Sequence, residues 1–155
     1  MTLDYVRQPD TLVEKLLSKF LNRSCELGIR LQICELIASL IDLYKLITPN
    51  LFNFYSRNIR PNQLNVSLMM EYMVRSVHDQ QVGDELLAVL KQIMLNFVHN
   101  ESSDEEMIIG INCITEVCRR APRILLEDED SITLLHELMS YSREKNVIHA
   151  RDESR

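Results

Sequence analysis

The chain has 155 residues and a formal net charge of −6; 46% of its residues are hydrophobic and 26% are charged. This length and composition suit one globular domain or a short stack of helices, and three glycines, four prolines and no tryptophan argue against a turn-rich β-architecture. The negative net charge disfavours nonspecific nucleic-acid binding on global electrostatics alone.

The N-terminal part of the chain is predicted to form two helices. A helix opens at Pro9 or Asp10, carries an apolar stripe and reaches Leu21, with Thr11 and Glu14 spaced as a capping box. A second, longer helix spans about residues 25–44, because its apolar residues recur every three or four positions.

Two prolines mark the predicted starts of the next two helices. Thr48 and Pro49 have the residue types of an N-cap followed by the first helical position, and a short aromatic helix follows them. Pro61 ends that helix and starts a fourth, methionine-rich helix that reaches about His78. Residues 79–82 are expected to form a loop.

A fifth helix over about residues 83–99 precedes the clearest helical signal in the chain, residues 103–122. Ser103 is a good N-cap, acidic residues fill the first turn, and two arginines end the helix before Pro122. Gly110 and Cys113 are small enough for a neighbouring helix to approach closely. The apolar stripe of this helix has steps of four, three and four residues and comprises Met107, Ile111, Ile114 and Cys118.

Further helices are predicted from Ser131 to Met139 and from about Glu144. The fold class is therefore predicted as all-α, a HEAT/armadillo-like α-solenoid of about seven or eight antiparallel helices, because the helical hairpins recur every 35 to 45 residues. A compact helical bundle is the alternative. We expect one domain over residues 1–155, with an irregular lead-in over 1–8 and a frayed tail over 151–155.

The sequence contains no motif that predicts catalysis. It has no phosphate-binding loop, dinucleotide fingerprint, nucleophile elbow or zinc-protease motif. The four cysteines form no CxxC pair, which favours reduced, buried thiols over zinc ligands. No apolar run reaches the roughly 18 residues of a membrane span. We expect an intracellular chain that is not an enzyme, has no cofactor, metal or small-molecule substrate, and has no membrane contact.

Two groups of arginines are the candidate contacts for a partner or RNA. The denser group is Arg119, Arg120 and Arg123. Complementarity with the helix dipole explains the first two, and contact with phosphate or an acidic partner is the functional alternative. The second, weaker group is Arg57 and Arg60, which lie near Tyr55 in the sequence. Arginine beside an exposed aromatic ring can suit RNA, whereas a ring packed in the core leaves the two arginines solvated.

Several segments together resemble the Sda family of large-subunit ribosome assembly factors, named for severe depolymerisation of actin. No short motif among them is unique, but their order and spacing are specific from Gln8 to Arg151. Family members usually carry prolines where this chain has Val82 and Gly83. The segments are QPDTLVEKLLSKF (8–20), LFNFYSRNIRPNQ (51–63), MLNFVHNESSDEEMIIGINCITEVCRRAP (94–122) and EKNVIHAR (144–151).

The resemblance implies a nuclear and nucleolar factor that binds pre-60S ribosomal particles during maturation and export of the large subunit, without catalysis. The implied partners are assembly factors, ribosomal proteins and rRNA. Because family members are much longer, with further repeats and basic regions, it also implies a fragment or a reduced member. The competing interpretation is a HEAT-like adaptor that binds only proteins in transport or cytoskeletal regulation.

Overall fold

The computed structural model describes residues 7–21, 26–81 and 83–125, together with positions 129, 133, 136, 137 and 140. Within the three continuous ranges the chain forms six α-helices and no strand, which confirms the all-α class. The helices predicted from Ser131 and Glu144 lie outside the described residues, apart from those single positions. The helices are α1 (Pro9–Lys15), α2 (Leu27–Tyr44), α3 (Leu51–Asn58), α4 (Val66–Arg75), α5 (Asp84–Phe97) and α6 (Asp104–Arg120).

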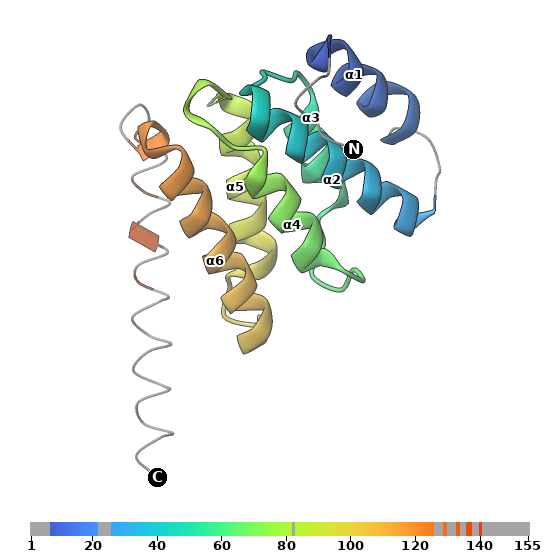
Figure 1. Ribbon diagram of the computed structural model, residues 1–155. Helices are drawn as coiled ribbons and strands as arrows, with labels where there is room; N and C mark the ends of the chain where they lie inside the picture. Colours follow the sequence, from blue (N-terminus) through green and yellow to red (C-terminus); the bar gives the residue numbers. More distant parts are fainter. Residues whose placement is uncertain are drawn as a thin grey trace.

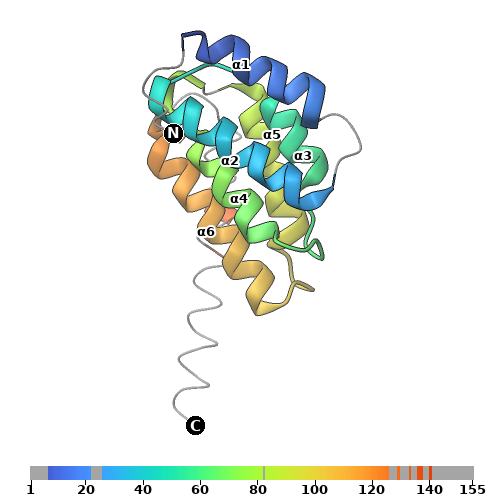
Figure 2. The same cartoon turned by 45° about the vertical axis from the view of Figure 1, so that its right-hand side comes forward.

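The helices alternate between two layers (Figure 1). One layer is made by α2, α4 and α6, which lie side by side, and the other by α3 and α5; α1 packs on α2 at the N-terminal end. The helices of the first layer run in one direction and those of the second layer run in the opposite direction. This alternation of antiparallel helices is the two-layer arrangement expected for a HEAT-like stack, and the view in Figure 2 agrees with it.

The core fills the space between the two layers. The aromatic side chains of α3 lie there, with Phe52, Phe54 and Tyr55 each at most 2% exposed. The rings of Phe54 and Tyr55 meet edge to face, with centroids 5.4 Å apart, a favourable aromatic geometry. Phe97 of α5 is also completely buried. The short aromatic helix predicted from sequence is therefore a core element.

The start of α6 has the features that the sequence predicted. The Ser103 hydroxyl accepts a hydrogen bond from the Glu106 backbone N–H at 3.2 Å, and Ser103 N–H donates to the Glu106 carboxylate at 3.4 Å. This reciprocal capping box satisfies two backbone groups that a helix start leaves unpaired. Residue pattern and local chemistry agree here, so the predicted helix bounds are confirmed.

Gly110 allows α5 and α6 to come into close contact. A Cβ atom at Gly110 would lie 2.7 Å from the Cβ of Phe97 and 3.0 Å from Cγ2 of Val98. No real Cβ tolerates the first of these distances, so any side chain at this position would push the two helices apart. The prediction that small residues admit a neighbouring helix is confirmed at this position.

The predicted starts of two helices and the predicted cap of another are wrong. Helix α1 begins at Pro9, in agreement with the prediction, but it has no side-chain cap; Thr11 lies inside the helix, so no capping box forms with Glu14. Helix α3 begins at Leu51 after Asn50, not at the predicted Pro49, and α4 begins at Val66 after Asn65, not at Pro61. Both asparagines have left-handed backbone angles (φ of 67° and 60°), which asparagine tolerates better than most residues.

Other boundaries differ by a few residues. Helix α1 continues as a π-helical segment, Leu16–Leu21, so the helical extent predicted to Leu21 holds with a change of type. Helix α4 ends at Arg75, three residues before His78, and residues 79–81 form a 3₁₀ turn within the predicted loop.

Buried polar side chains join the loops at one edge of the stack. Gln81 accepts a hydrogen bond from the Thr48 backbone N–H at 2.8 Å and donates one to the Ser76 carbonyl at 3.1 Å. His78 Nε2 lies 2.6 Å from the Leu46 carbonyl. The loop between α2 and α3 is thereby fastened to the segment between α4 and α5. These bonds satisfy backbone groups that would be costly to bury unpaired.

Candidate partner-binding groove

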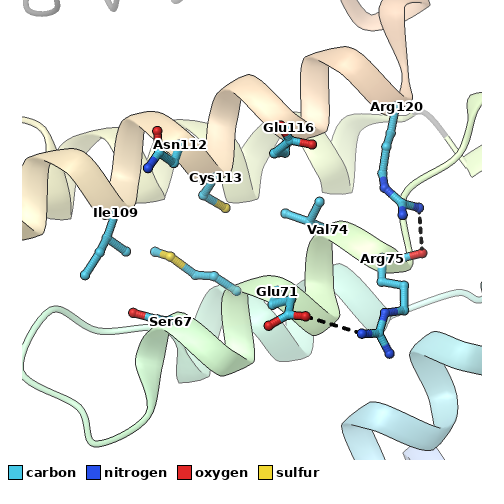
Figure 3. Close-up of a pocket in the computed structure, with 10 residues that line it drawn as sticks. Ser67, Glu71, Val74, Arg75, Ile109, Asn112, Cys113, Glu116 and Arg120 are labelled. Carbon is cyan, nitrogen blue, oxygen red and sulfur yellow. Dashed lines mark hydrogen bonds and ion pairs between the residues drawn. The ribbon is translucent and has the colours of Figure 1, made fainter.

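A groove of about 510 Å³ runs between α4 and α6 on the outer side of their layer (Figure 3). Its floor is apolar and is made by Met70 and Val74 of α4 and by Ile109 and Cys113 of α6. Met70 and Cys113 are buried, whereas Val74 and Ile109 are partly exposed. The floor therefore belongs to the helix–helix contact and leaves apolar surface open to a bound molecule.

Each helix contributes one polar wall to the groove. On each wall the order from the N-terminus is a small neutral polar residue, a glutamate and an arginine, at steps of four residues that place them on one helix face. The walls therefore present similar groups in the same order, because α4 and α6 run in the same direction. The residues are Ser67, Glu71 and Arg75 on α4, and Asn112, Glu116 and Arg120 on α6.

The glutamates of the groove already have cationic neighbours. Arg75 donates to Glu71 over 3.3 Å and lies over the Tyr72 ring, 5.7 Å from its centroid. Arg119 donates to Glu116 over 2.5 Å. The side chains of Glu71 and Glu116 are 60% and 44% exposed. Exposed ion pairs of this kind contribute only about 0–1 kcal/mol each, so they can exchange partners.

Arg120 joins all three helices of its layer. Its guanidinium donates to the Asp42 carboxylate of α2 over 3.4 Å and to the Arg75 carbonyl at the end of α4 over 3.2 Å; Figure 3 shows the second contact. Burial alone would raise the pKa of Asp42, but Lys45 and Arg120 outweigh burial and hold that pKa below its ordinary value of 3.8. Arg120 is thus engaged within the protein.

The two predicted arginine groups lie in different layers. Arg57 and Arg60 belong to the α3 side, whereas Arg119 and Arg120 belong to α6, and the exposed Arg123 follows in a 3₁₀ segment. The structure therefore does not bring the five residues into one patch. That they contact a partner stays a prediction.

The group of Arg57 and Arg60 lacks the exposed aromatic ring that would suit RNA. Tyr55 is fully buried, and burial raises the pKa of its hydroxyl well above the ordinary value. Arg60 donates to the carbonyls of Ser56 and Ile59, both at 2.9 Å, and so caps the end of α3. Arg57 is exposed and makes no hydrogen bond or ion pair within the described part of the chain.

The groove offers contacts and no reactive group. Burial raises the pKa of the Cys113 thiol to about 12, which keeps it protonated and a poor nucleophile at neutral pH. Cys34, Cys113 and Cys118 form no disulfide in the part of the chain that the structure describes. Among the described residues, no three metal-ligating side chains converge, and no helix is both long and apolar enough to cross a bilayer.

Sequence reasoning missed this groove. The signal was present in the equal spacing of Ser67, Glu71 and Arg75 and of their counterparts on α6. These two rows form one site only because α4 and α6, which are separated by α5 in the sequence, lie side by side in the fold. The sequence prediction instead relied on arginines that are close together along the chain, and such clusters lie on single helices.

Comparison with known proteins identifies the fold family. The model of the SDA1 HEAT-repeat family matches residues 1–145, which is nearly the whole chain and includes all six helices. The chain belongs to the SDA1 HEAT-repeat family. The resemblance seen in the sequence is thereby confirmed, and the two-layer arrangement of antiparallel helices agrees with membership.

Individual SDA1 relatives match over almost the whole chain. A protein SDA1 homolog of Xenopus laevis is 32% identical over 144 residues, which are 92% of this chain and 20% of the relative. The protein SDA1 homolog of Nematostella vectensis is 27% identical, covering 96% and 21%. Protein SDA1 of Chaetomium thermophilum is 29% identical, covering 93% and 18%. The chain spans about a fifth of the length of these relatives.

Proposed function

We propose that the chain is a non-enzymatic scaffold in ribosome biogenesis, which binds pre-60S particles during maturation and nuclear export of the large subunit. Membership of the SDA1 HEAT-repeat family over residues 1–145 carries this proposal. The two-layer stack supports it, because stacked helices expose long surfaces on which other macromolecules dock. The proposed location is the nucleus and nucleolus, and the proposed partners are assembly factors, ribosomal proteins and rRNA.

The proposed mechanism is docking of preformed helical faces, with no chemical step. Of the five predicted contact residues, Arg57 is the best placed, because its guanidinium is exposed and makes no ion pair with any described residue. Arg119 and Arg120 already bind carboxylates of the chain itself. At Arg119 and Arg120, a phosphate or acidic side chain of the particle would compete with those carboxylates. At Arg57 it would meet no such competitor.

The second candidate is a HEAT-like adaptor that binds only proteins in transport or cytoskeletal regulation. The internal pairing of Arg119 with Glu116 and of Arg120 with Asp42 favours it, since this pairing removes basic charge that RNA would need.

Sedimentation of cell extract through a sucrose gradient distinguishes the two. Co-migration of the chain with large-subunit rRNA precursors at moderate salt is expected for an assembly factor. Arg57→Glu should reduce that co-migration, whereas Lys15→Glu, the same charge change on the exposed surface of α1, should leave it intact. Recovery of the chain only in light fractions, with the precursors preserved, would favour the adaptor.

A further inference from the structure

We propose that the groove between α4 and α6 binds a cationic amphipathic helix of a protein partner. This deepens the scaffold role by naming the chemistry of one partner. The site is formed entirely by described residues of this chain, so it can be tested without any ribosomal particle.

The shape of the groove fits a helix. Two helices that run side by side leave between them a straight furrow into which a third helix packs its side-chain ridges. The ten residues of α4 give this furrow a length of about 15 Å, or about three helical turns. The apolar floor, formed in part by the exposed edges of Val74 and Ile109, would take the apolar stripe of such a helix.

The charge of the layer selects a cationic partner. Three of its four arginines, Arg75, Arg119 and Arg120, each already bind a carboxylate of the chain, and the fourth, in α2, donates to the Asn58 side chain of α3. Two further exposed carboxylates, Glu35 and Glu105, make no ion pair with a described residue. The outer surface of α2, α4 and α6 therefore carries an excess of negative charge, which repels RNA phosphates and attracts lysine or arginine side chains.

Glu71 and Glu116 are the residues that would receive those cations. They occupy the middle position of the two walls, on either side of the apolar floor, and Figure 3 shows them on α4 and α6 respectively. A helix whose apolar stripe lies on the floor would place flanking lysines beside both walls. Carboxylates that are 60% and 44% exposed can accept a second cation without the full cost of desolvation.

Two synthetic peptides test the proposal on the full chain. Both are helical and share a leucine stripe; one carries flanking lysines and the other flanking glutamates. Fluorescence anisotropy should show that the lysine peptide binds about tenfold more tightly, and amide NMR shifts should map its site to α4 and α6. A single-stranded RNA oligonucleotide should not displace it. Equal affinity for the two peptides, or displacement by the RNA, would overturn the proposal.

Charge reversal locates the binding energy. Glu71→Lys and Glu116→Lys should each weaken binding of the lysine peptide about fivefold, whereas Glu14→Lys, the same change at an exposed position of α1, should alter it less than twofold. Similar losses for all three variants would mean that only overall charge matters and would refute a groove site. Peptide binding can fail while the chain still co-migrates with ribosomal precursors, so this result and the scaffold role are distinguishable.

Discussion

The arginine side chains on the two helical layers have different bonding partners. On the α2/α4/α6 surface, Arg119 and Arg120 are held by carboxylates of the same surface. On the α3/α5 side, Arg60 bonds only backbone carbonyls, and Arg57 makes no polar contact with the described residues. The densest arginine cluster in the sequence is therefore the more engaged one. Availability of a guanidinium depends on neighbours in space, which sequence density does not report.

The largest effect is expected from breaking the contact on which both surfaces depend. Gly110→Ala would place a methyl group 2.7 Å from the Cβ of Phe97, in a part of the side chain that cannot rotate away. Overpacking costs about 1–3 kcal/mol, and the better helix propensity of alanine returns about 1 kcal/mol. We expect a net loss of up to about 2 kcal/mol in the free energy of unfolding, measured by urea denaturation.

Gly28→Ala is the matched control. It makes the same change in α2, where a new Cβ would meet no atom within 4 Å. Only helix propensity acts there, so the variant should be as stable as the parent or more stable by up to about 1 kcal/mol. Equal destabilisation by both substitutions would show that close packing of α5 on α6 is not the cause.

A smaller loss of stability is expected when one arginine in each layer is replaced by methionine. Arg120→Met removes the contacts to Asp42 and to the Arg75 carbonyl and should lower the free energy of unfolding by about 1 kcal/mol, since the site is partly exposed. Arg57→Met removes no polar contact with a described residue and should change stability by less than about 0.5 kcal/mol. Thermal and urea unfolding measure both. Equal losses of unfolding free energy in the two variants would show that the contacts of Arg120 do not stabilise the fold.

The smallest effect is a pH dependence at Asp42. Its pKa is lower in the folded chain than the ordinary value of 3.8, so its contribution to stability is present above that value and lost as the pH falls through the folded pKa. The stability difference between the parent and Asp42→Asn should therefore be constant above about pH 5 and shrink below it. With the Asp42 side chain 41% exposed, it should stay under about 1 kcal/mol. A difference that grows in acid would contradict this assignment.

The sequence predicted those parts of the fold that local chemistry controls. The Ser103 cap and the small Gly110 of α6 act within one helix or its immediate contact, and the structure confirms both. Of the predicted stripe, Met107 and Ile114 are buried, whereas Ile111 and Cys118 are only partly buried. The starts of α3 and α4 were mispredicted because proline is a frequent first helical residue, whereas here left-handed Asn50 and Asn65 redirect the chain.

The candidate site was less predictable than the fold. Each wall of the groove reads in the sequence as an ordinary solvated helix face, and charges on such faces usually signify nothing more. The two polar walls form one groove only because α4 and α6 lie side by side. In a stacked-helix protein the binding surface is assembled between repeats, so a search of one helix at a time overlooks it.

The reach of Arg120 bears on how the molecule unfolds. In an ideal linear array each unit touches only its immediate neighbours, and segments can open one at a time from either end. Here α6 bonds across α4 to Asp42 of α2, so the first and third members of one row share a direct link. Opening either of them costs the link to the other, and this coupling between non-adjacent units favours a single cooperative transition over fraying from one end.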